Sequence, residues 1–231
     1  MTVSVIPVEG LPEVVAGDDI AGLIAGRLGN DGLLAGDVIV IAHKIVSKSE
    51  DRVVSVAADA ATREEVALSE SARVLRRSGS LIISETKHGF VCANAGVDAS
   101  NVAMERVVIL PVDPDLSARR IRKRLVRLAG CDVGVVISDT FGRAWRLGQT
   151  NVAIGVAGLD PFVDYRGTLD SQGREMQATR ICIADEIAGA AELVMGKARS
   201  VPVAIVRGTP AVPGRGAAAE IIRPPGEDLF R

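Results

Sequence analysis

Residues 133–150 read VGVVISDTFGRAWRLGQT, an apolar run that changes abruptly into a polar segment after Ser138. Because the apolar part, 133–138, shows no strict alternation of apolar and polar residues, it is typical of a strand buried on both faces of a sheet. Similar runs rich in β-branched residues predict further strands at 38–42, 81–84, 107–110 and 201–206. The sequence therefore predicts a sheet that is covered on both sides.

Helical patterns separate these runs. Apolar residues at helical spacing predict helices over 18–28 and 184–197. Glutamates near its start and arginines near its end predict another helix over 63–77, because this order complements the helix dipole. Asp113 followed by Pro114 is typical of an N-cap and a first helical position, so we expect a helix from there to about residue 129.

The order of these elements indicates the fold class. Strands and helices follow one another without regular βαβ alternation, which favours an α+β fold of mixed sheets with packed helices over a doubly wound sheet. No repeat or flexible linker divides the chain, so we expect residues 1–231 to form a single domain. The stretch 211–231, rich in Gly, Pro and Ala near its start, is expected to be a loosely held C-terminal segment.

The composition excludes several classes of protein. With 48% hydrophobic and 24% charged residues, the chain of 231 residues is globular rather than disordered, and its 3% of aromatics leaves an aliphatic core. Lys and Arg total 27 against 29 for Asp and Glu, so the net charge selects neither nucleic acid nor an anionic membrane. No apolar run approaches the roughly 20 residues that a membrane span needs.

The cysteines, Cys92, Cys131 and Cys182, form no C-x-x-C pair. Their odd number and wide spacing argue against a disulfide framework and a zinc ribbon. Each lies in or beside an apolar run, so we expect small buried thiols. No signal peptide is visible, which points to the cytoplasm.

Common catalytic signatures do not occur in the sequence. It contains no G-x-x-x-x-G-K-[ST], G-x-G-x-x-G, H-E-x-x-H or G-x-S-x-G motif, and Gly196-Lys197 is followed by Ala198. The histidines, His43 and His88, lie in no recognisable nucleophile context. A P-loop of the usual kind is therefore excluded.

The polar residues after 133–138 form the densest candidate site. Asp139 would close the strand and point into the crevice where α/β proteins bind ligands, with the Thr140 hydroxyl beside it. Arg143 and Arg146 can grip phosphate or carboxylate groups. Oxygen ligands beside guanidinium groups suit a magnesium or manganese phosphate site. The alternative is a turn in which Asp139 caps a following helix and the arginines pair on the surface.

Other polar clusters also allow two interpretations. Asp98 and Asn101 offer oxygen ligands from a short loop, which could equally be a simple Asx turn. Lys44 and Lys48 suit phosphate binding, although exposed lysines are common. The stiff loop at 7–13 offers backbone groups that could hold a flat ring. Together the clusters describe a site for hard metal ions and phosphate without identifying a substrate.

Five segments of the sequence together resemble one family. They are Leu11-Pro12-Glu13, Lys44-Ile45-Val46-Ser47-Lys48, GVDASN at 96–101, SDTFGRAWR at 138–146 and ADEIA at 184–188. In this order they resemble the coenzyme F420:L-glutamate ligase family, the γ-glutamyl ligases of the deazaflavin coenzyme. The resemblance extends from about residue 6 to residue 207, most of the chain.

This resemblance implies a reaction, its cofactors and its partners. GTP would phosphorylate a terminal carboxylate of the deazaflavin coenzyme precursor, and the amine of L-glutamate would attack the acyl phosphate to give an amide, GDP and phosphate. Mg²⁺ or Mn²⁺ would be the cofactor, and the protein would be a homodimer of intertwined protomers. Neither nucleic acid nor a membrane is implied as a partner.

The resemblance also implies the site residues. The nucleotide would contact Leu11, Pro12, Glu13, Val14, His43, Lys48, Asn101 and Arg143, the first four at its guanine end. The divalent ions would be held by Asp98, Asp139 and Thr140, the last in the shell of a second ion. No residue is singled out as the general base.

Two positions depart from the family pattern. His43 stands where a small hydroxyl residue is expected. Lys197 stands where some relatives carry glutamine in the shell of the second metal ion, and a protonated ammonium cannot ligate a cation. Lys197 therefore either supplies the charge of that ion or only ends the helix over 184–197.

Two rival functions remain open. A metal-dependent phosphatase or nucleotidyl transferase could use the same aspartates, and it would consume GTP without glutamate. A non-catalytic GTP-binding domain would bind the nucleotide and consume none.

Overall fold

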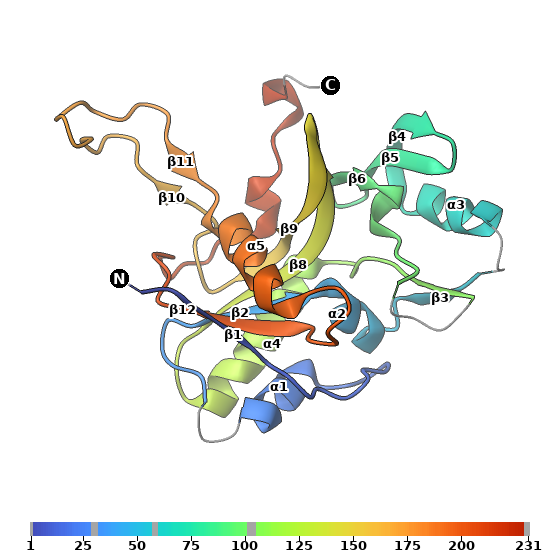
Figure 1. Ribbon diagram of the computed structural model, residues 1–231, viewed down its shortest axis with the longest axis horizontal. Coiled ribbons are helices and arrows are strands. Elements are labelled where there is room, and N and C mark those ends of the chain that lie inside the picture. Colours follow the sequence, from blue (N-terminus) through green and yellow to red (C-terminus); the bar gives the residue numbers. More distant parts are fainter. Residues whose placement is uncertain (1, 29–31, 57–59, 101–104, 229–231) are drawn as a thin grey trace.

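The computed structural model describes residues 2–28, 32–56, 60–100 and 105–228. In this part of the chain, the central sheet has its strands in the order β1, β12, β2, β8 and β9 (Figure 1). They span, in that order, Ser4–Pro7, Val203–Arg207, Val38–Ala42, Gly134–Arg143 and Arg146–Ala157. β2 and β8 are parallel and the other neighbouring pairs are antiparallel, so the predicted α+β class is confirmed.

Helices cover both faces of this sheet. The helices α1, α4 and α5 span Ile20–Leu28, Pro114–Ala129 and Ile183–Met195. α1 and α4 contribute to the same buried cluster as Ile39 and Ile137, whereas α5 packs with Val40 and Val136. Because successive residues of a strand point to opposite faces, β2 and β8 are apolar on both, as predicted. No helix within the described residues is long and apolar enough to cross a membrane.

α4 begins and ends where the sequence indicates. The Asp113 side chain accepts a hydrogen bond of 2.8 Å from the backbone N of Leu116 and so caps the first turn. Gly130 has a φ of 68° directly after the last residue, a left-handed conformation that ends helices and that glycine adopts without strain.

The helix predicted over 63–77 is wrong in its second half. α3 (Ala60–Ser69) is followed by a strand, β4 (Ser71–Ser78), which pairs antiparallel with β5 (Leu81–Thr86). Gly79, with a φ of 58°, allows the tight turn between the two strands. The arginines of β4 therefore lie on a strand and not at the end of a helix, so they do not interact with a helix dipole. Their contacts depend on the residues of the neighbouring strand.

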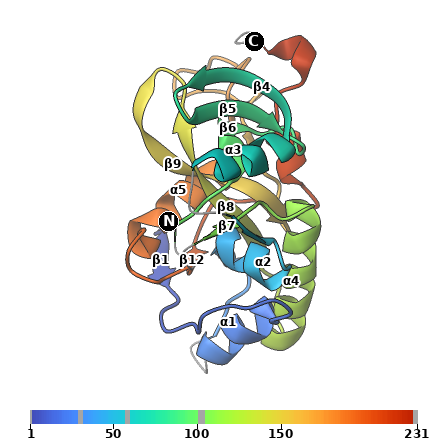
Figure 2. The same ribbon diagram turned by 90° about the vertical axis from the view of Figure 1, so that its right-hand side faces the viewer.

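The remaining elements extend from the central sheet. β4, β5 and β6 form a small sheet beside α3 (Figure 2), and β3 pairs with β7. β10 and β11 form the base of an arm that projects from the body of the molecule (Figure 1). The bounds not yet given are α2 His43–Ser49, β3 Val53–Ser55, β6 Val91–Ala93, η2 Asn94–Gly96, β7 Arg106–Val108, β10 Val163–Asp164, β11 Arg180–Ile181, η3 Ala218–Ile221 and η4 Pro225–Glu227.

The C-terminal stretch is anchored near its start, which corrects the expectation that all of 211–231 is loosely held. The Asp115 carboxylate accepts hydrogen bonds from the backbone N of Ala218 and of Ala219, at 2.8 and 3.2 Å. Ala218 is fully buried. The composition of the stretch gave no sign of this anchor because Asp115 lies far away in the sequence.

The cysteines are free thiols, as predicted. Cys92 is buried as expected, whereas Cys131 and Cys182 are only partly buried. Burial raises the pKa of Cys92 and of Cys182 to about 12. Both thiols are therefore protonated and unreactive near neutral pH.

Candidate functional site

A cleft of about 800 Å³ opens where the parallel pairing of β2 and β8 ends. Its walls come from the loop 11–14, α2, the residues Asp98 and Ser100, the β8–β9 hairpin, the end of α5 and the stretch 200–202. Its lining is rich in polar side chains: Glu13, His43, Lys44, Lys48, Asp98, Ser100, Ser138, Asp139, Thr140, Gln149, Asn151, Glu192, Lys197 and Ser200. Segments far apart in the sequence thus meet in one place.

The cleft brings together most of the residues predicted for a nucleotide and metal site. They are Leu11, Pro12, Glu13, Val14, His43, Lys48, Asp98, Asp139 and Thr140. Arg143 is not among them: it lies exposed near the tip of the β8–β9 hairpin and donates from Nη2 to the backbone O of Leu147 at 3.0 Å. Asn101 lies outside the described residues.

Asp139 lies within a strand, and the expectations that it ends a strand or caps a helix are both wrong. β8 continues to Arg143 as one side of a hairpin, in which Asp139 pairs with Val152. The parallel partner β2 ends at Ala42 beside Ser138, so Asp139 is the first residue of β8 beyond the parallel pairing. It therefore lines a cleft at the carboxyl end of β2, where ligand sites of such sheets form.

His43 faces Asp139 from the first position of α2. Its Nε2 lies 3.3 Å from Asp139 Oδ1, within ion-pair distance, but the alignment is not that of a hydrogen bond. The other ring nitrogen, Nδ1, lies 3.3 Å from Ser47 Oγ. Asp139 Oδ1 also accepts a hydrogen bond of 2.6 Å from the backbone N of Thr140. His43 is 1% exposed and Asp139 is partly buried, so a buried imidazole faces a carboxyl group that lines the cleft.

A left-handed turn positions Asp98. The residues of η2, 94–96, have φ values of 49°, 52° and 74°, and Asp98 then exchanges two backbone hydrogen bonds with Val108, at 3.0 and 2.8 Å. The Asp98 carboxylate contacts Lys44 Nζ at 2.8 Å and the backbone N of Ser100 at 2.6 Å. Burial alone would raise the pKa of Asp98, but the hydrogen bonds from Lys44 and Ser100 outweigh it and hold the pKa below its usual value.

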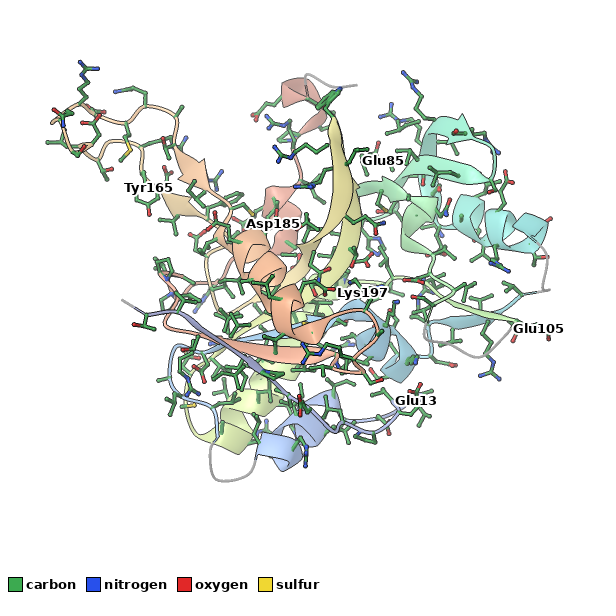
Figure 3. All side chains as sticks on the ribbon, viewed as in Figure 1. Glu13, Glu85, Glu105, Tyr165, Asp185 and Lys197 are labelled. Carbon is green, nitrogen blue, oxygen red and sulfur yellow. The ribbon has the colours of Figure 1, made fainter. Side chains whose placement is uncertain are left out.

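Lys48 links α2 to the loop 11–14. Its Nζ lies 2.6 Å from Glu13 Oε1, and its side chain is 11% exposed against 78% for that of Glu13. Val14 is 4% exposed and belongs to the hydrophobic core, so it fixes the end of the loop. Figure 3 shows Glu13 on this loop, at the side of the molecule where α2 lies. The loop and the lysine predicted for one nucleotide site are thus neighbours.

Asn151 and Glu192 are polar residues of the cleft that the sequence analysis missed. Asn151 is 4% exposed and lies opposite Thr140 on β9, and its Nδ2 donates to Glu192 Oε2 at 3.0 Å. The sequence offered one signal for Asn151, which is a polar residue directly before the apolar run 152–157. Lys197 completes the group (Figure 3), because its Nζ donates to Thr140 Oγ1 and, at 3.2 Å, to Asn151 Oδ1.

The oxygen atoms of the cleft fit a divalent ion that arrives with a ligand. The described residues form no group of three or more His, Cys, Asp or Glu side chains that could hold a metal alone. Asp98 and Asp139 nevertheless line the same cleft, and Mg²⁺ is usually held by one or two carboxylates together with substrate phosphates and water. The donor set therefore suits a metal bound through a phosphate ligand.

The fold and the cleft define an α+β protein with a preformed site suited to a phosphate-bearing ligand. The ammonium groups of Lys44, Lys48 and Lys197 line it together with the carboxyl groups of Asp98 and Asp139. Ammonium groups neutralise phosphate, and carboxyl groups hold the cation that accompanies it.

Comparison with known proteins identifies the family. Residues 10–208 match the family F420-0:Gamma-glutamyl ligase. Over an alignment 251 positions long, the chain is 46% identical to the coenzyme F420:L-glutamate ligase of Methanothermobacter thermautotrophicus, with all of both chains covered. It is 42% identical to the protein of the same name from Methanopyrus kandleri, covering all of this chain and 98% of the relative. A third relative of that name, from Methanocaldococcus jannaschii, is 42% identical over 85% of each chain.

The chain therefore belongs to the F420-0:gamma-glutamyl ligase family, and the resemblance seen in the five sequence segments is confirmed.

Proposed function

We propose that this protein is a ligase that joins L-glutamate to a precursor of coenzyme F420 through a γ-glutamyl amide bond, with GTP as the co-substrate. Family membership supports the proposal, since relatives that match the whole chain carry the name coenzyme F420:L-glutamate ligase. The observation that carries it is the cleft itself, where lysines and aspartates from distant segments converge.

The proposed reaction has two steps. In the first, an oxygen of the terminal carboxylate of the precursor attacks the γ-phosphorus of GTP, and GDP leaves. In the second, the amine nitrogen of glutamate attacks the carbonyl carbon of the acyl phosphate. The amide bond forms, inorganic phosphate leaves and the nitrogen loses a proton. Phosphoryl transfer depends mainly on positioning and charge neutralisation, which a cleft lined by lysines can supply.

Named residues would share this work. Lys44 and Lys48 would bind the phosphates, and the loop 11–14, stiffened by Pro12 and fixed at Val14, would hold the guanine end. Asp98 and Asp139 would hold Mg²⁺ or Mn²⁺, which when bound would neutralise charge on the phosphate oxygens.

An isotope experiment separates this proposal from its rivals. With oxygen-18 in the terminal carboxylate of the precursor, the acyl-phosphate route transfers one labelled oxygen to the released inorganic phosphate. A phosphatase or nucleotidyl transferase would consume GTP without glutamate and would release no labelled phosphate. A GTP-binding domain would consume none. Mass spectrometry of the phosphate, with and without glutamate, distinguishes all three.

We also propose that the protein is a homodimer. Trp145 and Leu147, near the tip of the β8–β9 hairpin, are 79% and 99% exposed, and the arm at β10 and β11 projects beyond the body (Figure 1). Large apolar side chains exposed together are typical of protein interfaces. Light scattering at micromolar concentration should give twice the chain mass of 24.1 kDa, and a monomeric mass would refute this proposal.

A further inference from the structure

The ammonium group of Lys197 lies among oxygen atoms from three separate elements of the fold. Its Nζ donates hydrogen bonds to Thr140 Oγ1 on β8 and to Asn151 Oδ1 on β9, and it lies 3.3 Å from Glu192 Oε2 on α5. All four residues line the cleft. Hydroxyl, amide and carboxylate oxygens are the donors that bind hard cations in proteins.

These oxygen atoms are held in place by contacts of their own. Thr140 and Asn151 are cross-strand partners, and Thr140 Oγ1 donates to Asn151 Oδ1 at 2.7 Å. Asn151 is buried, and the hydrogen bond from its Nδ2 to Glu192 Oε2 leaves its Oδ1 directed toward the lysine. The group should therefore keep its arrangement when Lys197 is replaced.

A role at the end of α5 does not account for these contacts. α5 ends at Met195, and Gly196, with a φ of 59°, turns the chain, so Lys197 lies outside the helix. A lysine that served only the helix dipole would approach the last main-chain carbonyl groups. Lys197 instead contacts side-chain oxygens on two strands and on the helix.

We propose that Lys197 is a built-in cation of the cleft and takes the place of a second divalent ion. The inference rests on the proposed function in one respect, that a nucleotide binds in the cleft together with one divalent ion. The ammonium contacts the oxygen atoms that a second ion would need as ligands. The ammonium and such an ion are both positively charged, so they would repel one another. Lys197 would then offer positive charge to the phosphates at any metal concentration.

Counting bound Mn²⁺ tests this inference without turnover. Protein saturated with a non-hydrolysable GTP analogue is titrated with Mn²⁺, and free Mn²⁺ is followed by electron paramagnetic resonance. We expect one Mn²⁺ per chain in the wild type and two in Lys197→Gln, which removes the charge and adds a neutral oxygen. Lys197→Met, which only removes the charge, should also gain the second ion, with lower affinity.

A matched control and a double variant locate the effect. Arg199→Gln removes a positive charge two residues further along, from an exposed side chain that does not line the cleft, and should still bind one Mn²⁺. Adding Glu192→Gln to Lys197→Gln removes a carboxylate ligand and should weaken the second Mn²⁺ at least tenfold. Circular dichroism establishes that each variant is folded.

The outcomes separate this inference from the proposed function. Two Mn²⁺ in the wild type, or equal counts in the wild type and Lys197→Gln, would overturn the role of Lys197. A gain of one ion in Lys197→Gln, in a protein that adds no glutamate to the coenzyme precursor, would support that role and reject only the ligase activity.

Discussion

His43 Nε2 and Asp139 Oδ1 lie 3.3 Å apart at the point where the parallel strands β2 and β8 part. Ala42 is the last residue of β2 and pairs with Ser138. The residues that follow them, His43 and Asp139, therefore face each other. Because the imidazole is buried beside a carboxyl group that lines the cleft, we infer that His43 positions Asp139.

Replacing Asp139 by Asn should abolish metal-dependent turnover and leave the fold intact. Asparagine keeps the size and can accept the hydrogen bond from the Thr140 backbone, but it has no charge for a divalent ion. We expect the affinity for Mn²⁺, measured calorimetrically with a bound GTP analogue, to fall at least about tenfold, or ~1.4 kcal/mol. Asp51→Asn, at an exposed carboxyl outside the cleft, is the control. Equal Mn²⁺ affinity in Asp139→Asn and the wild type would exclude Asp139 as a ligand.

Lys48→Met should weaken nucleotide binding far more than it weakens the fold. An ammonium bonded to phosphate contributes about 1.5–3 kcal/mol, so we expect the Kd of a GTP analogue to rise about 10- to 100-fold. The ion pair with the exposed Glu13 should add at most about 1 kcal/mol to the free energy of unfolding. Lys87→Met, an exposed lysine paired with Glu70, is the control. An unchanged Kd for Lys48→Met would remove this residue from the phosphate site.

Asp115→Ala should release the C-terminal stretch. The carboxylate accepts hydrogen bonds from the backbone N of Val156, Ala218 and Ala219, and alanine leaves these groups without an acceptor. We expect the free energy of unfolding, measured in urea, to fall by about 2–3 kcal/mol. Limited proteolysis should then cut faster after residue 211.

The helix cap at Asp113 provides the matched control. Asp113→Ala also removes a carboxylate from the start of α4 and should cost about 1 kcal/mol, without exposing the C-terminal stretch. Equal proteolysis rates for the two variants would contradict the anchoring role of Asp115.

Asp185 should make the protein less stable at neutral pH than its amide variant. Burial raises the pKa of Asp185, although its carboxylate accepts a hydrogen bond of 2.8 Å from the backbone N of Ala153. A folded-state pKa above the unfolded value means that the charged form disfavours folding, so the penalty is present at pH 7. It declines as the pH falls through the folded pKa, and it is absent below the unfolded value of 3.8.

Urea unfolding of Asp185→Asn at several pH values checks this sign. We expect the variant to be more stable than the wild type at pH 7 and the difference to disappear in acid. Asp98, whose pKa is lowered, should behave in the opposite sense: Asp98→Asn should be less stable than the wild type at pH 7. If both variants were more stable than the wild type at pH 7, or both less stable, the directions of the two pKa shifts would be wrong.

Some features of the molecule could be predicted because their signals are local. The strand at 38–42 is apolar at successive positions, a pattern typical of a strand buried on both faces. The cap of α4 is contained in the adjacent residues Asp113 and Pro114. The motif residues of the cleft could be named from sequence alone because the family resemblance groups them.

Other features depend on partners distant in the sequence. The stretch Ser71–Ser78 is a strand because β5 pairs with it. β8 extends beyond Ser138 because β9 pairs with its polar second half. Asn151 meets Thr140 and Glu192 only in the folded chain. No periodicity within a single segment could have revealed these contacts.

The mass of the product tests the central claim most directly. The protein is incubated with GTP, Mn²⁺, L-glutamate and the deazaflavin precursor, and the precursor is then weighed by mass spectrometry. We predict an increase by one glutamyl residue or a multiple of it, which requires both GTP and glutamate and does not occur with Asp139→Asn. An unchanged precursor mass, with folded protein that binds GTP, would contradict the account.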